Sequence, residues 1–241
     1  MCNLYHLSPR DSVAIYFRAL VPDYVPAAVG PFGSGLMLRA QADGALAGSL
    51  GQWGMIKPGS KTRRPTSRAI LTNNARIEGI AERVTYRQAW ERGQRCLIPA
   101  AWYQEPNWET GRNIWWRLQR ADGAPWGIAG LWSEWVDPDT GEVVPNYTMV
   151  TVNCDDHPLL SRLHKPDDKL PADAQDKRSL VCLEPSQWDT WLNGDEGDAR
   201  ALLSPPATDV FDQGVTLHTD GLLARMKQEA SEPSPNNPQL F

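Results

Sequence analysis

The chain has 241 residues, of which 41% are hydrophobic, and a formal net charge of −5. This length and composition are typical of a globular protein with one large or two small domains. No run of about 18 apolar residues exists, which excludes a membrane-spanning helix. The N-terminus has neither the basic nor the apolar region of a secretory signal, so we expect a cytoplasmic protein.

The predicted elements begin with an amphipathic helix over residues 11–20, where Ser8 and Asp11 have the spacing of an N-terminal cap. Residues 22–48 are rich in Pro, Gly and Ala, which predicts an irregular region with short extended pieces. A strand over residues 49–56 follows, and then a basic loop over residues 61–68.

The second half alternates short strands with strong turn signals. Thr85 and Gln88 have the spacing of a capping box before a helix over residues 86–91, which Gly93 ends. Strands are predicted over residues 95–99, where Pro99 ends the strand, and over 113–119, 126–132, 146–152 and 180–183, with helices over 185–192 and 198–203.

Because the strands show no regular βαβ period, we predict an α+β fold. It should be a single domain with a curved, mostly antiparallel β-sheet or barrel-like core flanked by helices. Residues 1–228 form this domain, and residues 229–241 are rich in Glu, Ser, Pro, Asn and Gln, which predicts a disordered tail.

The four cysteines, Cys2, Cys96, Cys154 and Cys182, are scattered without a CxxC motif. This favours reduced thiols and disfavours a zinc site, so we expect neither a metal nor a cofactor. Cys2 is distinctive, because removal of Met1 would place a thiol and a free α-amine on one residue. Such an N-terminal cysteine condenses with an aldehyde to an imine and closes through sulfur to a thiazolidine. The alternative is a small buried hydrophobic residue.

Positive charge is concentrated between residues 57 and 95, which hold ten Lys or Arg against three Glu, a local net charge of +7 against −12 elsewhere. This distribution is typical of a face that binds an anion, although a solvated basic loop is the alternative. The candidate phosphate contacts are Lys61, Arg63, Arg68 and Arg76. Most of the eleven tryptophans should lie in the core, but Trp53 is a candidate for stacking on a base.

Three further polar residues are candidates for work with Cys2. Asn74 can donate to a developing oxyanion. Glu105 follows an apolar strand, where desolvation raises a carboxyl pKa. His164 can act as acid or base near neutral pH, and His157 is a second choice. Taken alone, each of these residues is equally compatible with a catalytic role and with a surface or structural role.

Six motifs are now apparent: Met1-Cys2-Asn3-Leu4-Tyr5; Trp53-Gly54-Met55-Ile56; Asn74-Ala75-Arg76-Ile77-Glu78; Arg95-Cys96-Leu97-Ile98-Pro99-Ala100 with Glu105 after it; Ile128-Ala129-Gly130-Leu131-Trp132; and Tyr147-Thr148-Met149-Val150-Thr151. In this order they resemble the SOS-response-associated peptidase (SRAP) family. Leu4 replaces the usual Arg and Gln104 the usual aromatic residue. The family's His-x-Arg-Met-Pro segment is interpreted as stretched over residues 164–171.

The resemblance implies a protein that binds single-stranded DNA and forms a thiazolidine crosslink between Cys2 and the ring-opened aldehyde of an abasic site. Glu105 would shuttle protons, Asn74 would bind the sugar or the amine, and His164 would stabilise the opened sugar. It also implies a monomer that associates with the nucleoid when bound to DNA. The alternatives are a cysteine-type peptidase that uses Cys2 as nucleophile, including self-removal of Met1, and a non-catalytic single-strand binder.

Overall fold

The computed structural model describes residues 1–67 and 70–212. Its elements are β1 (Tyr5–Leu7), α1 (Arg10–Phe17), β2 (Ala19–Leu20), β3 (Ala28–Val29), β4 (Ser34–Ala40), β5 (Leu46–Trp53), β6 (Asn74–Arg76), η1 (Ile77–Gly79), α2 (Val84–Glu91), β7 (Arg95–Asn107), β8 (Ile114–Leu118), β9 (Trp126–Val136), β10 (Val143–Asn153), η2 (Leu160–Arg162), β11 (Arg178–Leu180), η3 (Pro185–Gln187), α3 (Trp188–Asn193), α4 (Glu196–Ala201) and η4 (Thr208–Val210). Arg68 and the predicted tail lie outside the described residues.

Five strands close a barrel-like core. Strand β10 pairs with β5, β5 with β4, β4 with β7, β7 with β9, and β9 again with β10. Only the pairings β10–β5, β10–β6 and β2–β5 are parallel in the described sheet. The predicted α+β class with a mostly antiparallel, barrel-like sheet in a single domain is therefore confirmed.

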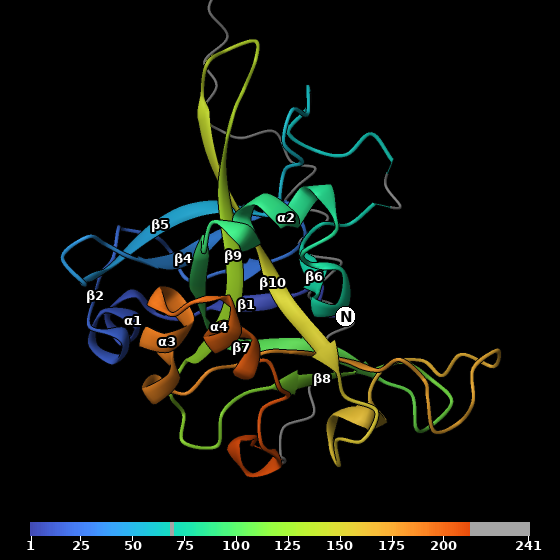
Figure 1. The fold of residues 1–241 in the computed structure, drawn as a ribbon. Helices are drawn as coiled ribbons and strands as arrows, with labels where there is room; N and C mark the ends of the chain where they lie inside the picture. Colours follow the sequence, from blue (N-terminus) through green and yellow to red (C-terminus); the bar gives the residue numbers. More distant parts are fainter. Residues whose placement is uncertain (68–69, 213–241) are drawn as a thin grey trace, which may run out of the picture.

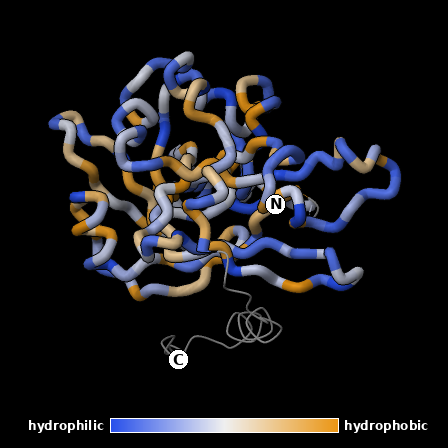
Figure 2. The backbone as a smooth tube through the Cα atoms, turned by 90° about the horizontal axis from the view of Figure 1, so that it is seen from below, coloured by the Kyte–Doolittle hydropathy of each residue, from blue (hydrophilic) through white to orange (hydrophobic). Residues whose placement is uncertain are grey.

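Helices cover the outside of the barrel (Figure 1). Helix α2 packs against β9, whereas α3 packs against β7 and against α4. The N-terminus emerges on the side away from α1 and α3. Apolar segments are concentrated in the body of the molecule, and the projecting loops are mainly hydrophilic (Figure 2).

Both predicted helix caps are wrong. Helix α1 begins at Arg10 after Pro9 without a side-chain cap, and Ser8 is buried instead. The helix ends at Phe17 because Arg18 adopts a left-handed conformation, with φ of 50°. Helix α2 begins at Val84, so Thr85 lies inside its first turn and cannot cap it.

The prediction of irregular structure over residues 22–48 is also wrong, because β4 and β5 form a hairpin there. Gly44, with φ of 81°, lies in its turn, whereas Gly35 serves close packing. A Cβ at Gly35 would collide with the hydroxyls of Tyr5 and Tyr147, which pair inside the barrel. Small residues in this stretch therefore carry a packing role that composition alone does not distinguish from a loop.

Pro99 does not end its strand, since β7 continues to Asn107. On one side, Leu97 pairs with β4, whereas Ala100 pairs with β1. Pro99 lies where β7 changes neighbours, and there its missing N–H interrupts no ladder on that side. This continuation carries Glu105 past β1 to the N-terminal segment.

The β9–β10 hairpin projects beyond the barrel, next to the basic loop (Figure 1). The Trp135 indole Nε1 donates to the Ser60 carbonyl at 2.9 Å. Trp135 also packs with Ile56 and Val144 in a small cluster of its own. Ser60, which immediately precedes the basic loop, is thus anchored to the hairpin.

Candidate active site

The register of two strands brings the N-terminus to Glu105. Tyr5 pairs with Tyr103 in antiparallel strands, so the residues before Tyr5 run alongside those after Tyr103. The Gln104 N–H donates to the Leu4 carbonyl at 3.0 Å and continues this pairing. Cys2 is consequently buried beside the end of β7, and its thiol donates to the Leu4 carbonyl at 3.3 Å.

Three ionisable groups meet at one imidazole nitrogen. His164 Nε2 lies 2.6 Å from the α-amine of Met1 and 2.8 Å from Glu105 Oε2. The amine lies 3.5 Å from the same carboxylate oxygen. One imidazole nitrogen holds at most one proton, so Nε2 can donate to the carboxylate or accept from the amine. The geometry is suited to moving a proton between an N-terminal amine and Glu105.

The pKa of Glu105 corrects an expectation. Burial raises the pKa of this carboxyl, as the sequence predicts, but the Met1 ammonium and His164 together lower it by more, and the net pKa lies below its usual value. Glu105 is therefore ionised at neutral pH, the form of a carboxyl group that can accept a proton. By contrast, burial and, to a lesser extent, the charge of Glu105 raise the pKa of the Cys2 thiol, so the thiol is protonated.

His164 is held in an uncommon backbone conformation, with φ of 64°. Its N–H donates to the Pro106 carbonyl at 2.6 Å, and Lys177 Nζ donates to its carbonyl at 2.7 Å. Asp155 fixes Lys177 in turn, since Oδ1 accepts from the Lys177 N–H at 2.8 Å. Sequence analysis missed Lys177, which returns to His164 only through the fold.

The segment interpreted as the stretched motif, residues 164–171, is irregular. Residues 165–175 form a loop, Pro171 is exposed, and the chain returns to the sheet at β11. The loop spans most of the thirteen-residue separation between His164 and Lys177.

Asn74 and its neighbour hold the Cys2 backbone. Strand β6 places Asn74 beside Met149 of β10, and its Nδ2 donates to the Cys2 carbonyl at 2.6 Å. Asn73 Nδ2 donates to the same carbonyl at 3.1 Å. Asn74 Oδ1 is buried without a partner among the described residues. Sequence analysis missed Asn73, although the asparagine doublet was visible.

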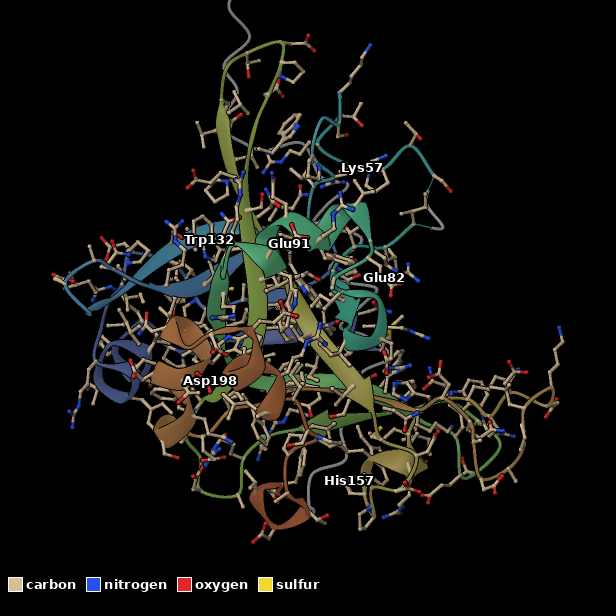
Figure 3. All side chains as sticks on the ribbon, in the orientation of Figure 1. Lys57, Glu82, Glu91, Trp132, His157 and Asp198 are labelled. Atoms are coloured by element: carbon tan, nitrogen blue, oxygen red, sulfur yellow. The ribbon has the colours of Figure 1, made fainter. Side chains whose placement is uncertain are left out.

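His157 has a structural role, at the foot of the barrel beside η2 (Figure 3). Its Nε2 lies 2.8 Å from the Pro206 carbonyl, and its Nδ1 accepts from the Leu160 N–H at 3.0 Å. Of the two candidate histidines, only His164 lies with Cys2.

The residues predicted to contact DNA lie in different environments in the structure. Arg76 is part-exposed and pairs with Asp176 at 2.7 Å. Lys61 is exposed in the basic loop, and Arg63 Nε donates to Gln52 Oε1 at 3.1 Å. Trp53 is fully buried and donates to the Asn73 carbonyl at 2.8 Å, so it cannot stack on a base and is a core residue instead.

A cavity of about 110 Å³ adjoins the amine and is lined by Met1, Asn74, Arg76 and Arg83, among others. Arg83 is a further basic residue that the sequence did not single out. Two guanidinium groups beside an amide are a suitable setting for a phosphate or a polar sugar.

Within residues 1–67 and 70–212, no group of three or more His, Cys, Asp or Glu is placed to hold a metal ion. The four cysteines are unpaired and buried. In the same part of the chain, no helix is long and apolar enough to cross a membrane.

Comparison with known proteins places this site in a family. The abasic site processing protein HMCES of Xenopus tropicalis is 25% identical over 138 residues, which are 50% of this chain and 40% of that protein, so the match spans less than half of the relative. A solved structure from Bordetella bronchiseptica has a TM-score of 0.76 and 35% identity, covering 87% of this chain and 97% of the other.

A structure from Bacteroides thetaiotaomicron, with a TM-score of 0.65 and 20% identity over 88% of this chain and 90% of the other, shares the fold. Residues 2–216 match the sequence profile of the family described as SOS response associated peptidase (SRAP). The chain therefore belongs to the SRAP family.

Proposed function

We propose that this protein binds single-stranded DNA and captures abasic sites through a covalent thiazolidine link to Cys2, formed after removal of Met1. The observation that carries this proposal is the meeting of the Met1 amine, His164 and Glu105 within 3.5 Å, next to Cys2 and Asn74. Removal of Met1 would leave the Cys2 amine as the N-terminal amine beside the same two groups. Membership in the family supports it, as does the name of the Xenopus relative, an abasic site processing protein.

The chemistry follows from these groups. The neutral α-amine of Cys2 attacks C1′ of the ring-opened aldehyde, and the carbinolamine loses its hydroxyl as water to give an imine. Glu105 accepts the proton from the amine, and His164 relays a proton to the departing hydroxyl. The Cys2 sulfur then adds to the imine carbon while its proton passes to nitrogen, which closes the five-membered ring. One water is lost overall.

Removal of Met1 would also make room for the lesion. Met1 lines the small cavity that contains Asn74, Arg76 and Arg83. We assign the enlarged space to the opened sugar and its phosphate, with the two arginines as phosphate contacts. The free Asn74 Oδ1 accepts from a sugar hydroxyl or from the amine.

Arg76, Arg83 and the basic loop give affinity without sequence preference, because phosphate contacts carry no base information. A lesion that arises in any sequence requires affinity of that kind. We assign the function to a monomer in the cytoplasm, associated with the nucleoid when bound, and to residues 1–228 as one domain.

Intact mass spectrometry under denaturing conditions tests the proposal. The protein is measured alone and after mixing with an oligonucleotide that carries one abasic site. We expect loss of Met1 and an adduct equal to protein plus oligonucleotide minus one water. A Met1-free chain without an adduct would overturn the mechanism and favour the cysteine-type peptidase, even though the buried Cys2 thiol is closed to a foreign peptide in this structure.

A further inference from the structure

A cavity of about 460 Å³ adjoins His164 and lies outside the chemistry described above. Its walls are the end of β7 with Trp108 and Glu109, the turn at Arg162, and the loop over residues 165–176. In Figure 1 the two loops extend to the same side of the barrel, below the N-terminus. The volume is within the range of small-molecule sites.

The side chain of Gln175 holds the loop that forms one wall of the cavity. Gln175 Oε1 accepts from the Asp167 N–H at 2.8 Å, and its Nε2 donates to the carbonyls of Leu170 at 3.1 Å and Pro171 at 2.9 Å. Nε2 also donates to the Asp167 carbonyl at 3.2 Å. A loop held at both ends in this way needs little ordering when a ligand binds.

The charges in the cavity disfavour a phosphate. Its lining holds three carboxylates, Glu109, Asp167 and Asp168, against two cations, Arg162 and Lys177. The exposed Asp168 carboxylate lines the cavity and has no hydrogen-bond partner among the described residues. An excess of carboxylates repels an anion, and a carboxylate without a partner accepts from a neutral donor.

Trp108 supplies the complementary surface. Its indole is part-exposed in the cavity, and the Lys165 ammonium lies 5.4 Å from its ring centroid, which helps to fix the ring. An aromatic face next to a hydrogen-bond acceptor is the usual setting for an unstacked base, since every base has a π-face and several have an amino group.

We propose that this cavity binds the base of a nucleotide that adjoins the abasic site, and that it prefers a base with an exocyclic amino group. The base stacks on Trp108 and donates its amino hydrogen to Asp168. The proposal rests on the proposed function, because the sugar held at His164 brings its neighbour to the cavity. Such a pocket adds a local preference to binding that is otherwise independent of sequence.

The test uses binding to single-stranded oligonucleotides that carry a tetrahydrofuran abasic analogue, which has no aldehyde and cannot be crosslinked. Cytosine or uracil is placed on either side of the analogue, since these bases have the same shape and differ at the amino group and N3. On one side of the analogue, we expect cytosine to give about tenfold tighter binding than uracil. This ratio lies in the lower part of the range for a contact to a base edge.

Two variants with the same charge change form a matched pair. D168N should reduce the cytosine preference to less than about twofold. D173N alters an exposed residue of the same loop that does not line the cavity, and it should keep the preference. W108A should weaken binding of both oligonucleotides by about tenfold, from lost stacking.

Equal Kd values for cytosine and uracil on both sides, or equal behaviour of D168N and D173N, would overturn the base pocket. Crosslinking of a true abasic site is measured separately by mass. A wild-type chain that crosslinks without any base preference overturns the pocket alone, whereas a preference without crosslinking supports the pocket and overturns the covalent function.

Discussion

Replacement of Lys177 by methionine should slow capture of abasic sites about 10- to 150-fold. Lys177 Nζ donates to the carbonyl of His164, whose φ of 64° is uncommon for a residue with a side chain. A hydrogen bond from a charged group contributes about 1.5–3 kcal/mol. At about 1.4 kcal/mol for each factor of ten, its loss reduces the population of the competent His164 conformer by the stated factor.

The rate of crosslinking is measured by denaturing gel with an oligonucleotide that carries one abasic site. K177R keeps a donor and should recover part of the rate. In an H164A background, K177M should have no further effect, because Lys177 acts through His164. A wild-type rate for K177M, or an equal loss in the H164A background, would refute a positioning role.

Three further results are expected. C2S should abolish the crosslink that survives denaturation while Kd for the tetrahydrofuran oligonucleotide changes less than about twofold, since phosphate contacts supply the affinity; equal loss of both would indicate misfolding. R76Q should weaken binding and lower the salt slope by about one, and an unchanged slope would remove Arg76 from the phosphate contacts. E105Q should slow crosslinking about 10²–10⁴-fold. The Met1 ammonium and His164 hold the folded pKa of Glu105 below its usual value, so the stability advantage of wild type over E105Q, measured by urea unfolding, should be complete above the usual carboxyl pKa. It should decline as the pH falls through the folded pKa, and an advantage that stays constant down to acid pH would contradict the ion pair.

Much of the fold was predictable from local signals. The strands around residues 113–119, 126–132 and 146–152 are separated by turn sequences, and the structure contains β8, β9 and β10 there. The closure of the barrel was not predictable in detail, because it depends on β9 pairing with both β7 and β10. The local sequence of a strand does not show which distant strand it pairs with.

The candidate residues were named from motifs, but their convergence depends on register. A shift of one residue between Tyr5 and Tyr103 would turn Glu105 to the other face of β7. The direction of the Glu105 pKa was missed for a related reason, since its charged partners come from residues 1 and 164. Trp53 was misassigned because the residue type alone does not distinguish a tryptophan in the core from one on the surface.

The environment of Cys2 determines the order in which its two nucleophiles act. Burial and the charge of Glu105 raise the pKa of the thiol, whereas the Met1 amine, one residue before Cys2, lies within reach of Glu105 and His164. In the proposal these two groups exchange protons with the Cys2 amine once Met1 is removed. In the proposed reaction the amine therefore attacks first. The protonated imine then places a positive charge next to the sulfur, which opposes both effects that raise the thiol pKa and favours loss of its proton. Ring closure follows imine formation, and a buried, protonated thiol does not react with other electrophiles before an aldehyde is bound.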